Sequence, residues 1–457
     1  MKSKSGEAAK TTNQSSLAIR GGEPAVKSDP GDNFTWPIIT REDENAALDV
    51  IRRGAMSDID VTLKFEEEFA HWQGCTYALG YNNGTGAVQA AMFSIKIGAG
   101  DEVICPSLNF WASVIQCYSL GATPVFAEVD PVTLCLDPGD IEHRITEDTK
   151  AIVVNHNYGH PADMDAIIAI AERSDLKVLE DVSHAHGALY KGRKVGSFGD
   201  VAAASMMSKK SLATGEAGML WTEDREIYDR AIAWGHYNLF TPDIETTDLK
   251  NLFGIPLGGV KARTHQVSAA MGRVQLKHYD KRTEEIQKAI NYFWDLLDGV
   301  PGIKPHRIFK DSGSTMGGWY SPKGHYRSEE LEGLSLSAFA NAVNAEGGFC
   351  DPGCNLPLHL HPVFSEADIY GHGKPTRNAH TSREIHQPRG SLPVSEGIGE
   401  KVFGVPRFNY YKSEFIEKHA AAYRKVAENY RELLAGDKGN PGYLTRWDIP
   451  KPTVWSA

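Results

Sequence analysis

The sequence has few of the features that mark secreted, membrane-spanning or nucleic-acid-binding proteins. It contains only six cysteines among 457 residues, without regular spacing, as is typical of reduced thiols in a cytoplasm. No apolar run approaches the roughly 18 residues of a membrane span, and the first residues lack the apolar core of a secretory signal. Basic residues are also few, because 48 Lys and Arg stand against 59 Asp and Glu, a formal net charge of −11. This balance disfavours nucleic acid and anionic membrane as partners, so we expect a cytoplasmic protein that acts on small molecules.

The chain does have a globular composition and an alternating pattern. Apolar residues make up 41% and charged residues 23%, and the length is ample for two or three domain-sized units. Between about residues 75 and 225, short runs rich in Val and Ile alternate with helical stretches such as 87–97 and 164–173. The runs are Asp101–Pro106, Pro124–Val129, Ala151–Asn155, Lys177–Glu180 and Val201–Met206. This alternation of apolar runs and helical stretches predicts an α/β fold with a mostly parallel central sheet flanked by helices. Such sheets bind ligands at the carboxyl ends of their strands.

Helix signals and breakers divide the chain into four regions. Helices are expected at Thr40–Arg53, which opens with a capping-box pattern from Thr40 to Asp43, and at Val61–Gln73. A long polar helix, Gln275–Leu297, runs into Pro301 and indicates a domain boundary, and further helices are expected at Ser337–Glu346 and Ser413–Leu434. We predict an N-terminal arm over residues 1–35, mobile up to about residue 30, and a large domain over 36–290. A smaller α+β domain over 291–436 and a tail over 437–457 complete the prediction.

Three polar motifs stand out around the predicted sheet. Residues Asn82–Ala87 place two glycines and a threonine at a helix start, a pattern that favours a bound anion but also fits an ordinary helix cap. Asp181 ends a strand, where a carboxylate points into the ligand crevice or caps the next turn. Ser205–Lys210 ends another strand with hydroxyls and two lysines, before the glycine-containing turn 214–218. A lysine at a sheet edge is, taken alone, more often a solvated charge.

Together these motifs supply the groups that pyridoxal phosphate requires. A lysine forms the Schiff base with the cofactor, and a carboxylate keeps the ring nitrogen protonated. Backbone amides and hydroxyls hold the phosphate. The sequence therefore favours a pyridoxal phosphate enzyme over an inert scaffold.

Short stretches in a characteristic order and spacing extend this interpretation over about residues 36–435. They are Asn83–Thr85, Gly100–Ile104, Gly121–Phe126, Glu180–Asp181 with Ala185–Ala188, Gly196–Asp200, Thr214–Glu216, Leu358–Leu360 with Pro362, and Leu392–Glu396. In these stretches the sequence resembles the DegT/StrS-type sugar aminotransferases, a family of fold-type I pyridoxal phosphate enzymes.

The resemblance implies roles for single residues around the cofactor. The family's Schiff-base lysine lies five residues after a phosphate-binding serine and five before a Gly-Glu pair, which selects Lys210 and Ser205. Asp181 matches the carboxylate on the pyridine nitrogen. His184 stands where the family usually has Gln, beside the ring hydroxyl, and Phe110 matches the aromatic residue that stacks on the ring.

The resemblance also implies contacts to the phosphate and to the substrate. Gly84, Thr85 and Gly86 match the phosphate-binding amides and hydroxyl. Lys261 stands where the family often has an Asn that reaches the neighbouring subunit's phosphate. His359 and Glu396 match positions near the sugar. Two departures from the family pattern are Ala217, in place of a second glycine, and Lys209, an extra cation beside Lys210.

The implied function is transfer of an amino group from glutamate or glutamine to a keto-sugar or keto-cyclitol, by a ping-pong mechanism, in a homodimer with shared active sites. A sugar dehydratase or epimerase would share every cofactor contact, but dehydratases of this family replace the lysine with His. A non-enzymatic regulatory protein on the same fold would not need both Lys210 and Asp181. The nearby Cys350, Cys354, His359 and His361 lack the long loop of a zinc finger, so no metal is expected.

Overall fold

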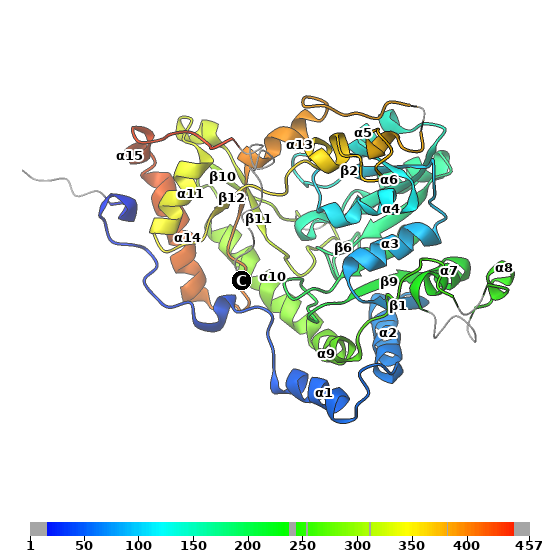
Figure 1. The fold of residues 1–457 in the computed structure, drawn as a ribbon. Helices are drawn as coiled ribbons and strands as arrows, with labels where there is room; N and C mark the ends of the chain where they lie inside the picture. Colours follow the sequence, from blue (N-terminus) through cyan, green and yellow to red (C-terminus); the bar gives the residue numbers. More distant parts are fainter. Residues whose placement is uncertain (1–15, 237–243, 253–254, 310–311, 382, 443–457) are drawn as a thin grey trace, which may run out of the picture.

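A computed structural model describes residues 16–236, 244–252, 255–309, 312–381 and 383–442 of the chain. Two sheets organise these residues, and Figure 1 shows the larger sheet with its helices on the right and the smaller on the left. Within the described residues, no helix is both long and apolar enough to cross a membrane.

The larger sheet has seven strands in the order β1-β9-β8-β5-β4-β2-β3. Their bounds are β1 Tyr77–Tyr81, β9 Gly218–Thr222, β8 Val201–Ser205, β5 Lys177–Asp181, β4 Thr149–Asn155, β2 Glu102–Pro106 and β3 Thr123–Ala127. The strands from β8 to β3 are parallel, whereas β9 is antiparallel to both β8 and β1. This confirms the predicted α/β fold with a mostly parallel sheet, and it adds β1 at an edge of the sheet.

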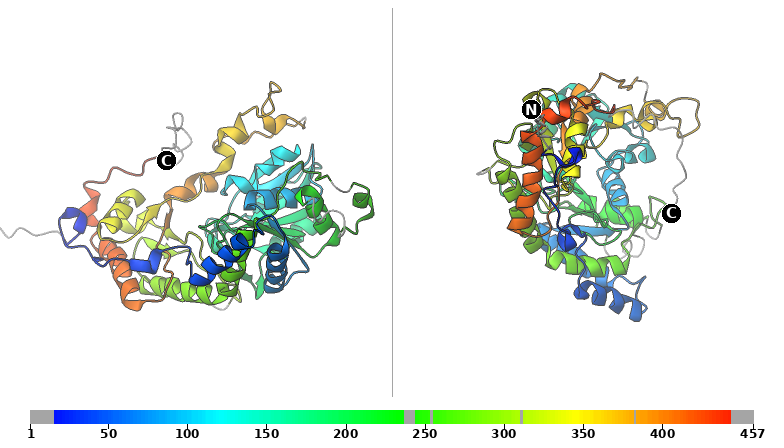
Figure 2. Two further views of the ribbon diagram at one scale, coloured as in Figure 1. Left: turned by 60° about the horizontal axis from the view of Figure 1, so that its bottom comes forward. Right: turned by 90° about the vertical axis from the view of Figure 1, so that its left-hand side faces the viewer.

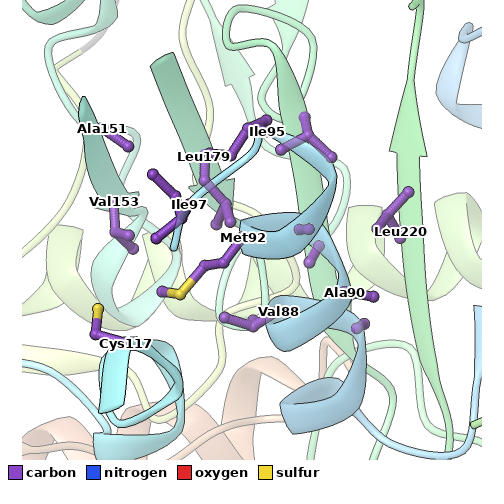
Figure 3. Packing of buried hydrophobic residues seen from close by; sticks show 14 of the residues in the cluster. Val88, Ala90, Met92, Ile95, Ile97, Cys117, Ala151, Val153, Leu179 and Leu220 are labelled. Atoms are coloured by element: carbon purple, nitrogen blue, oxygen red, sulfur yellow. The ribbon is translucent and has the colours of Figure 1, made fainter. Parts of the chain in front are cut away.

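Helices cover both faces of this sheet because its strands are apolar on both sides. On one face, α3 (Gly84–Ser94) packs with α7 (Arg225–Gly235), and Figure 3 shows Val88 and Met92 of α3 in one cluster with Val153 and Leu179 of the strands. On the other face, Ile152 and Val154 pack with residues of α6 (Met164–Arg173), near α5 (Pro138–Arg144). The alternation of Ile152, Val153 and Val154 between the two cores follows from the period of two in a strand.

The smaller sheet has four antiparallel strands in the order β10-β11-β13-β12. They are β10 Ile303–Pro305, β11 Lys323–Tyr326, β13 Val402–Gly404 and β12 Asp351–Pro352. Three helices share a core with this sheet: α10 (Tyr279–Leu296), α11 (Leu336–Ala345) and α14 (Ser413–Glu428). The other elements are α1 Arg41–Arg52, α2 Asp60–Gln73, α4 Gln116–Leu120, α8 Thr247–Lys250, α9 Gln266–Lys277, α12 Pro362–Ser365, α13 Pro393–Gly397, α15 Arg431–Leu434, β6 Leu189–Tyr190 and β7 Arg193–Lys194.

Most predicted helices are present, but two of them are interrupted. Thr40 and Asp43 form a capping box on α1, and Gly74 ends α2 with a left-handed φ of 81°. The helix expected at Gln275–Leu297 is mostly α10, whereas its first residues belong to α9, which begins at Gln266; the two helices meet at His278. The Nε2 atom of His278 lies 2.9 Å from Glu42 of α1, so a tertiary contact anchors this junction. The helix expected over 413–434 is likewise divided into α14 and α15.

The prediction of a mobile arm is wrong for the second half of that arm. The chain from Leu17 to Val26 packs against the core that the smaller sheet shares with its helices. Leu17 is fully buried, and both carboxylate oxygens of Glu346 accept backbone N–H groups of this segment, from Ala18 and Ala25. Lys425 of α14 also binds Glu346, at 2.7 Å. Residues 1–15 of the arm and 443–457 of the tail lie outside the described residues.

A long connection between β12 and β13 runs along the edge strand β3, and Figure 2 shows it in yellow and orange beside the larger sheet. The side chain of Gln387 accepts from the Phe126 N–H at 2.8 Å and donates to the Phe126 carbonyl at 2.7 Å. Arg383 forms two hydrogen bonds to the buried Glu102 of β2. The two bonds of Gln387 cover the free edge of β3, which would otherwise be open to pairing, and the Arg383 bonds hold the connection to the neighbouring strand.

Candidate active site

A cavity of about 490 Å³ lies at the carboxyl ends of the parallel strands, between the two sheets. The larger sheet contributes Asn155, Asp181 and Ser205 from the ends of β4, β5 and β8, and the smaller sheet contributes Lys323 and Asp351. This is the place where doubly wound sheets bind their ligands.

Lys210 is a buried amine in this cavity. It lies in the turn that follows β8, where its N–H donates to the Met207 carbonyl and its own carbonyl accepts from Trp36 Nε1 at 2.9 Å. The side chain is only 7% exposed, and burial lowers the pKa of Lys210 to about 8, although the charge of Asp181 acts in the opposite direction. A lysine with this pKa is partly neutral near physiological pH. Lys209 is exposed and is absent from the described lining of the cavity.

Asp181 is the buried carboxylate of the cavity. One of its oxygens accepts the Ser183 N–H at 3.0 Å, and the other accepts the hydroxyl of Ser113. The neighbouring Glu180 points to the opposite face of the sheet, where it binds His156 and the backbone N–H groups of the turn 196–199. Strand alternation thus gives the two carboxylates different surroundings, and Asp181 is the one that faces the cavity.

The glycine turn that begins α3 packs directly against the end of β8. A Cβ atom on Gly84 would lie 2.4 Å from the Ser205 Cβ, so only glycine fits there. Gly84, Thr85 and Ser205 line the cavity at the positive N-terminal end of α3, an arrangement suited to a phosphate. Asn83 caps the same helix by accepting the Gly86 N–H at 2.8 Å, so that amide is already engaged.

His184 is held in a stack of aromatic rings along the cavity wall. Its ring lies between Tyr320, at a centroid distance of 4.3 Å, and Tyr158, at 5.7 Å. Burial, and then the positive charge of Lys210, keep the pKa of His184 well below its usual range, so the imidazole is neutral. Phe110 lies at the rim of the cavity, 48% exposed, beside Trp111.

Four of the predicted site residues are absent from the described cavity lining: Gly86, Lys261, His359 and Glu396. Lys261 lies on the surface, in a loop whose Ala262 carbonyl accepts the Asn82 N–H at 2.6 Å. His359 is buried, with Nδ1 2.7 Å from the Ser107 hydroxyl and Nε2 3.1 Å from Glu396. These two residues therefore brace Ser107, which precedes the cavity residues Asn109 and Phe110.

No sequence pattern predicted several of the residues that the fold brings to the cavity. Tyr320 comes from a strained turn, in which Trp319 and Ser321 have left-handed φ angles of 51° and 48°. A Cβ on Gly318 would lie 2.1 Å from the Ser211 Cβ, so the turn approaches the lysine-bearing segment closely. The pair Gly317-Gly318 before Trp319 and Tyr320 is the signal that could have identified this turn. Asn155 and Tyr158 could have been found because Asn155 is the last residue of a predicted strand and Tyr158 lies in the turn after it.

The residues present fit the pyridoxal phosphate that the resemblance implies. Two buried amide atoms of the cavity lining, Asn109 Nδ2 and Asn155 Oδ1, have no hydrogen-bond partner among the described residues. Such atoms indicate that a polar molecule completes the site. The partly neutral amine of Lys210, the carboxylate of Asp181 and the N-terminus of α3 match the aldehyde, ring nitrogen and phosphate of that cofactor.

Comparison with known proteins shows the family of the chain. The model of the DegT/DnrJ/EryC1/StrS aminotransferase family matches residues 37–401. The chain is 30% identical to L-glutamine:2-deoxy-scyllo-inosose aminotransferase of Streptoalloteichus tenebrarius, over 92% of this chain and 99% of that protein. It is 32% identical to GDP-perosamine synthase of Escherichia coli O157:H7, over 66% of this chain and 78% of that protein. Among solved structures, an aminotransferase from Psychrobacter cryohalolentis superposes with a TM-score of 0.74 at 27% identity, covering 88% of this chain and 99% of the other.

Proposed function

Because the chain belongs to the DegT/DnrJ/EryC1/StrS aminotransferase family, we propose that it uses pyridoxal phosphate to move an amino group from glutamate or glutamine to a keto-sugar or keto-cyclitol. The observation that carries the proposal is that Lys210 and Asp181, both buried, line one cavity together with the N-terminus of α3. The relatives named above support the substrate class, since one acts on a keto-cyclitol and the other makes a nucleotide-linked amino sugar, as their names state.

The chain has a residue for each part of the cofactor. The Gly84 and Thr85 amides and the Ser205 hydroxyl would bind the phosphate. Asp181 would hold a proton at the ring nitrogen, and its bonds to Ser183 and Ser113 fix its orientation. His184, neutral because it is buried, would contact the ring hydroxyl, and Phe110 would cover one face of the ring.

The cofactor, when bound, supplies an electron sink that stabilises negative charge at the α-carbon of the donor. Lys210 provides the base for this step, because its lowered pKa leaves a neutral amine that can take the proton from that carbon. The same amine would carry the proton away from the donor carbon, and it would act in the reverse order when the ketone is aminated. Since one cavity serves both substrates in turn, the donor product leaves before the ketone enters, which gives ping-pong kinetics.

We further propose a homodimer in which Lys261 of one subunit reaches the phosphate site of the other. Lys261 lies on the surface in a loop that contacts Asn82, beside the phosphate-binding turn. A cation there would supply charge to the phosphate and would couple cofactor binding to assembly. Light scattering of the protein with and without cofactor, with Lys261→Ala alongside, tests this; an active monomer would contradict it.

The function is tested with purified protein, pyridoxal phosphate, and a panel of keto-cyclitols and nucleotide-linked keto-sugars. With glutamine or glutamate as donor, we expect an aminated product and parallel lines in double-reciprocal plots. Release of water or inversion of a carbon without amination would instead indicate a dehydratase or an epimerase. A protein that binds the cofactor but aminates none of the ketones would contradict the proposal.

A further inference from the structure

Two amide atoms in the lining of the cavity are buried and have no hydrogen-bond partner among the described residues. They are Asn109 Nδ2 and Asn155 Oδ1, and their side chains belong to residues that are 4% and 3% exposed. The other atoms fix how the two amides are turned, because Asn109 Oδ1 accepts the Phe110 N–H at 2.7 Å and Asn155 Nδ2 at 3.2 Å. The pair therefore has one N–H donor and one carbonyl acceptor left for a ligand, which would remove the cost of leaving both unpaired.

The order of the strands places this pair on one side of Asp181. Ser205 ends β8, Asp181 ends β5 and Asn155 ends β4, and these three strands are neighbours in the larger sheet. Asn155 and Asp181 are partners in the strand register, so their side chains lie on the same face of strands that are about 4.8 Å apart. Asn109 follows β2, the next strand in the sheet. Asp181 is thus flanked by Ser205 on one side and by the two asparagines on the other.

The cofactor of the proposed function carries its polar groups in a matching order. On its pyridine ring, the phosphate-bearing arm and the hydroxyl lie on opposite sides of the axis through the ring nitrogen. With the phosphate at Ser205 and the ring nitrogen at Asp181, the hydroxyl falls on the side of the two asparagines. A hydroxyl both donates and accepts, so it can pair with the carbonyl of Asn155 and the N–H of Asn109 at once. The methyl group on the same side of the ring can pair with neither.

We propose that Asn109 and Asn155 form a binding site for a hydroxyl group, and that this hydroxyl is the one on the ring of the cofactor. The inference rests on the proposed function, and it adds two residues to the contact proposed for His184. A keto-sugar or keto-cyclitol also carries hydroxyls, so the experiment has an arm for each source. An ordered water is the third occupant to test, and it would bridge the two amides whether or not the cofactor carries a hydroxyl.

The test compares two ligands that bind without forming a covalent bond: pyridoxamine phosphate and its analogue without the ring hydroxyl. Calorimetry on the cofactor-free protein gives the Kd of each ligand for the wild type and for Asn155→Leu, which keeps the branched shape but has no polar atoms. Loss of a buried hydrogen bond predicts that the variant binds pyridoxamine phosphate about 5- to 50-fold more weakly. The analogue should lose less than about twofold, because it makes no use of the pair. Should Asn155→Leu fail to fold, Asn109→Ser replaces it with the same expectation, since its hydroxyl oxygen can still accept the Phe110 N–H.

The matched control is Asn341→Leu on α11, where the asparagine is exposed and absent from the described lining of the cavity. It should change neither Kd. An equal loss for both ligands in Asn155→Leu, which a bridging water or a purely structural role predicts, would overturn the inference. Unchanged binding of pyridoxamine phosphate would also overturn it, and a higher KM of the ketone in that variant would assign the hydroxyl to the substrate. Failure of the proposed function would appear differently, as normal binding of pyridoxamine phosphate without amino transfer in the wild type.

Discussion

Replacing Asp181 with Asn tests the electrostatic basis of the site. The carboxylate is 6% exposed and is held by Ser183 and Ser113, so the amide can occupy the same position with little rearrangement. At a separation of ~3 Å and an effective dielectric constant of ~20, the lost attraction to a protonated ring nitrogen is about 5 kcal/mol. The amide still offers a hydrogen bond, so a net loss of about 3–4 kcal/mol remains, which corresponds to a fall in kcat of about 10²- to 10³-fold.

The same change predicts a second effect on Lys210, in a direction fixed by the structure. The charge of Asp181 raises the pKa of Lys210, against the larger lowering by burial, so Asp181→Asn shifts that pKa further below about 8. The rate at which pyridoxal phosphate combines with the cofactor-free protein depends on the neutral amine. The pH at which this association rate reaches half of its maximum, its midpoint, should therefore be lower in the variant.

Stopped-flow measurement of cofactor association between pH 6 and pH 10, together with steady-state kcat, gives both quantities. Asp165→Asn is the control, because Asp165 lies on the surface of α6 and pairs with Lys191. It should change neither the midpoint nor kcat. Near-normal kcat in Asp181→Asn, or a midpoint that moves to higher pH, would refute the assignment of Asp181 as the carboxylate on the ring nitrogen.

Three further predictions concern the lysines and the glycine turn. Lys210→Ala should abolish turnover while Lys209→Ala retains it, and borohydride reduction followed by peptide mapping should find the cofactor on Lys210; label on Lys209 would reverse the assignment. Lys210→Met should stabilise the cofactor-free protein at pH 7 by up to about 3 kcal/mol, because the unfolded state binds a proton that the native state releases at about pH 8. That gain should shrink as the pH rises from 8 to 10.5, and a gain that stays constant in thermal melts would disprove the link. Gly84→Ala should weaken cofactor binding at least tenfold, since its Cβ would lie 2.4 Å from the Ser205 Cβ; unchanged cofactor affinity would show that the turn can move aside.

The parts of the site that could be predicted are those encoded within a single strand and the turn after it. Asp181, Ser205 and Lys210 each follow an apolar run, and the parallel sheet brings the ends of such runs to one edge. Strand alternation then separates Asp181 from Glu180 without any further information. The choice of Lys210 over Lys209 came from the family resemblance, in which the lysine lies five residues from the serine and from the Gly-Glu pair, and it remains a prediction that peptide mapping can decide.

The parts that could not be predicted depend on contacts between distant segments. Tyr320 and Lys323 reach the cavity only because the smaller sheet packs against the larger one, and no local pattern in residues 300–330 states which side chains face it. The buried N-terminal segment was missed for a related reason. Its composition is polar, but Leu17 inserts into the smaller core, and Glu346 compensates two of the backbone N–H groups that burial would otherwise leave unpaired.

The properties of Lys210 depend both on its local sequence and on contacts with distant segments. The sequence places an amine at the end of a strand, but its reactivity follows from its pKa, which burial sets. Several distant segments provide that burial: Trp36 binds the Lys210 carbonyl, Tyr320 covers the amine, and the strained Gly317–Ser321 turn holds Tyr320 in place. Relaxing any of these contacts would admit water, raise the pKa toward 10.5 and reduce the neutral fraction of the amine. If Lys210 is the base of the proposed reaction, we expect residues far from it in the sequence to set the rate at neutral pH, through solvent exclusion rather than through contact with a substrate.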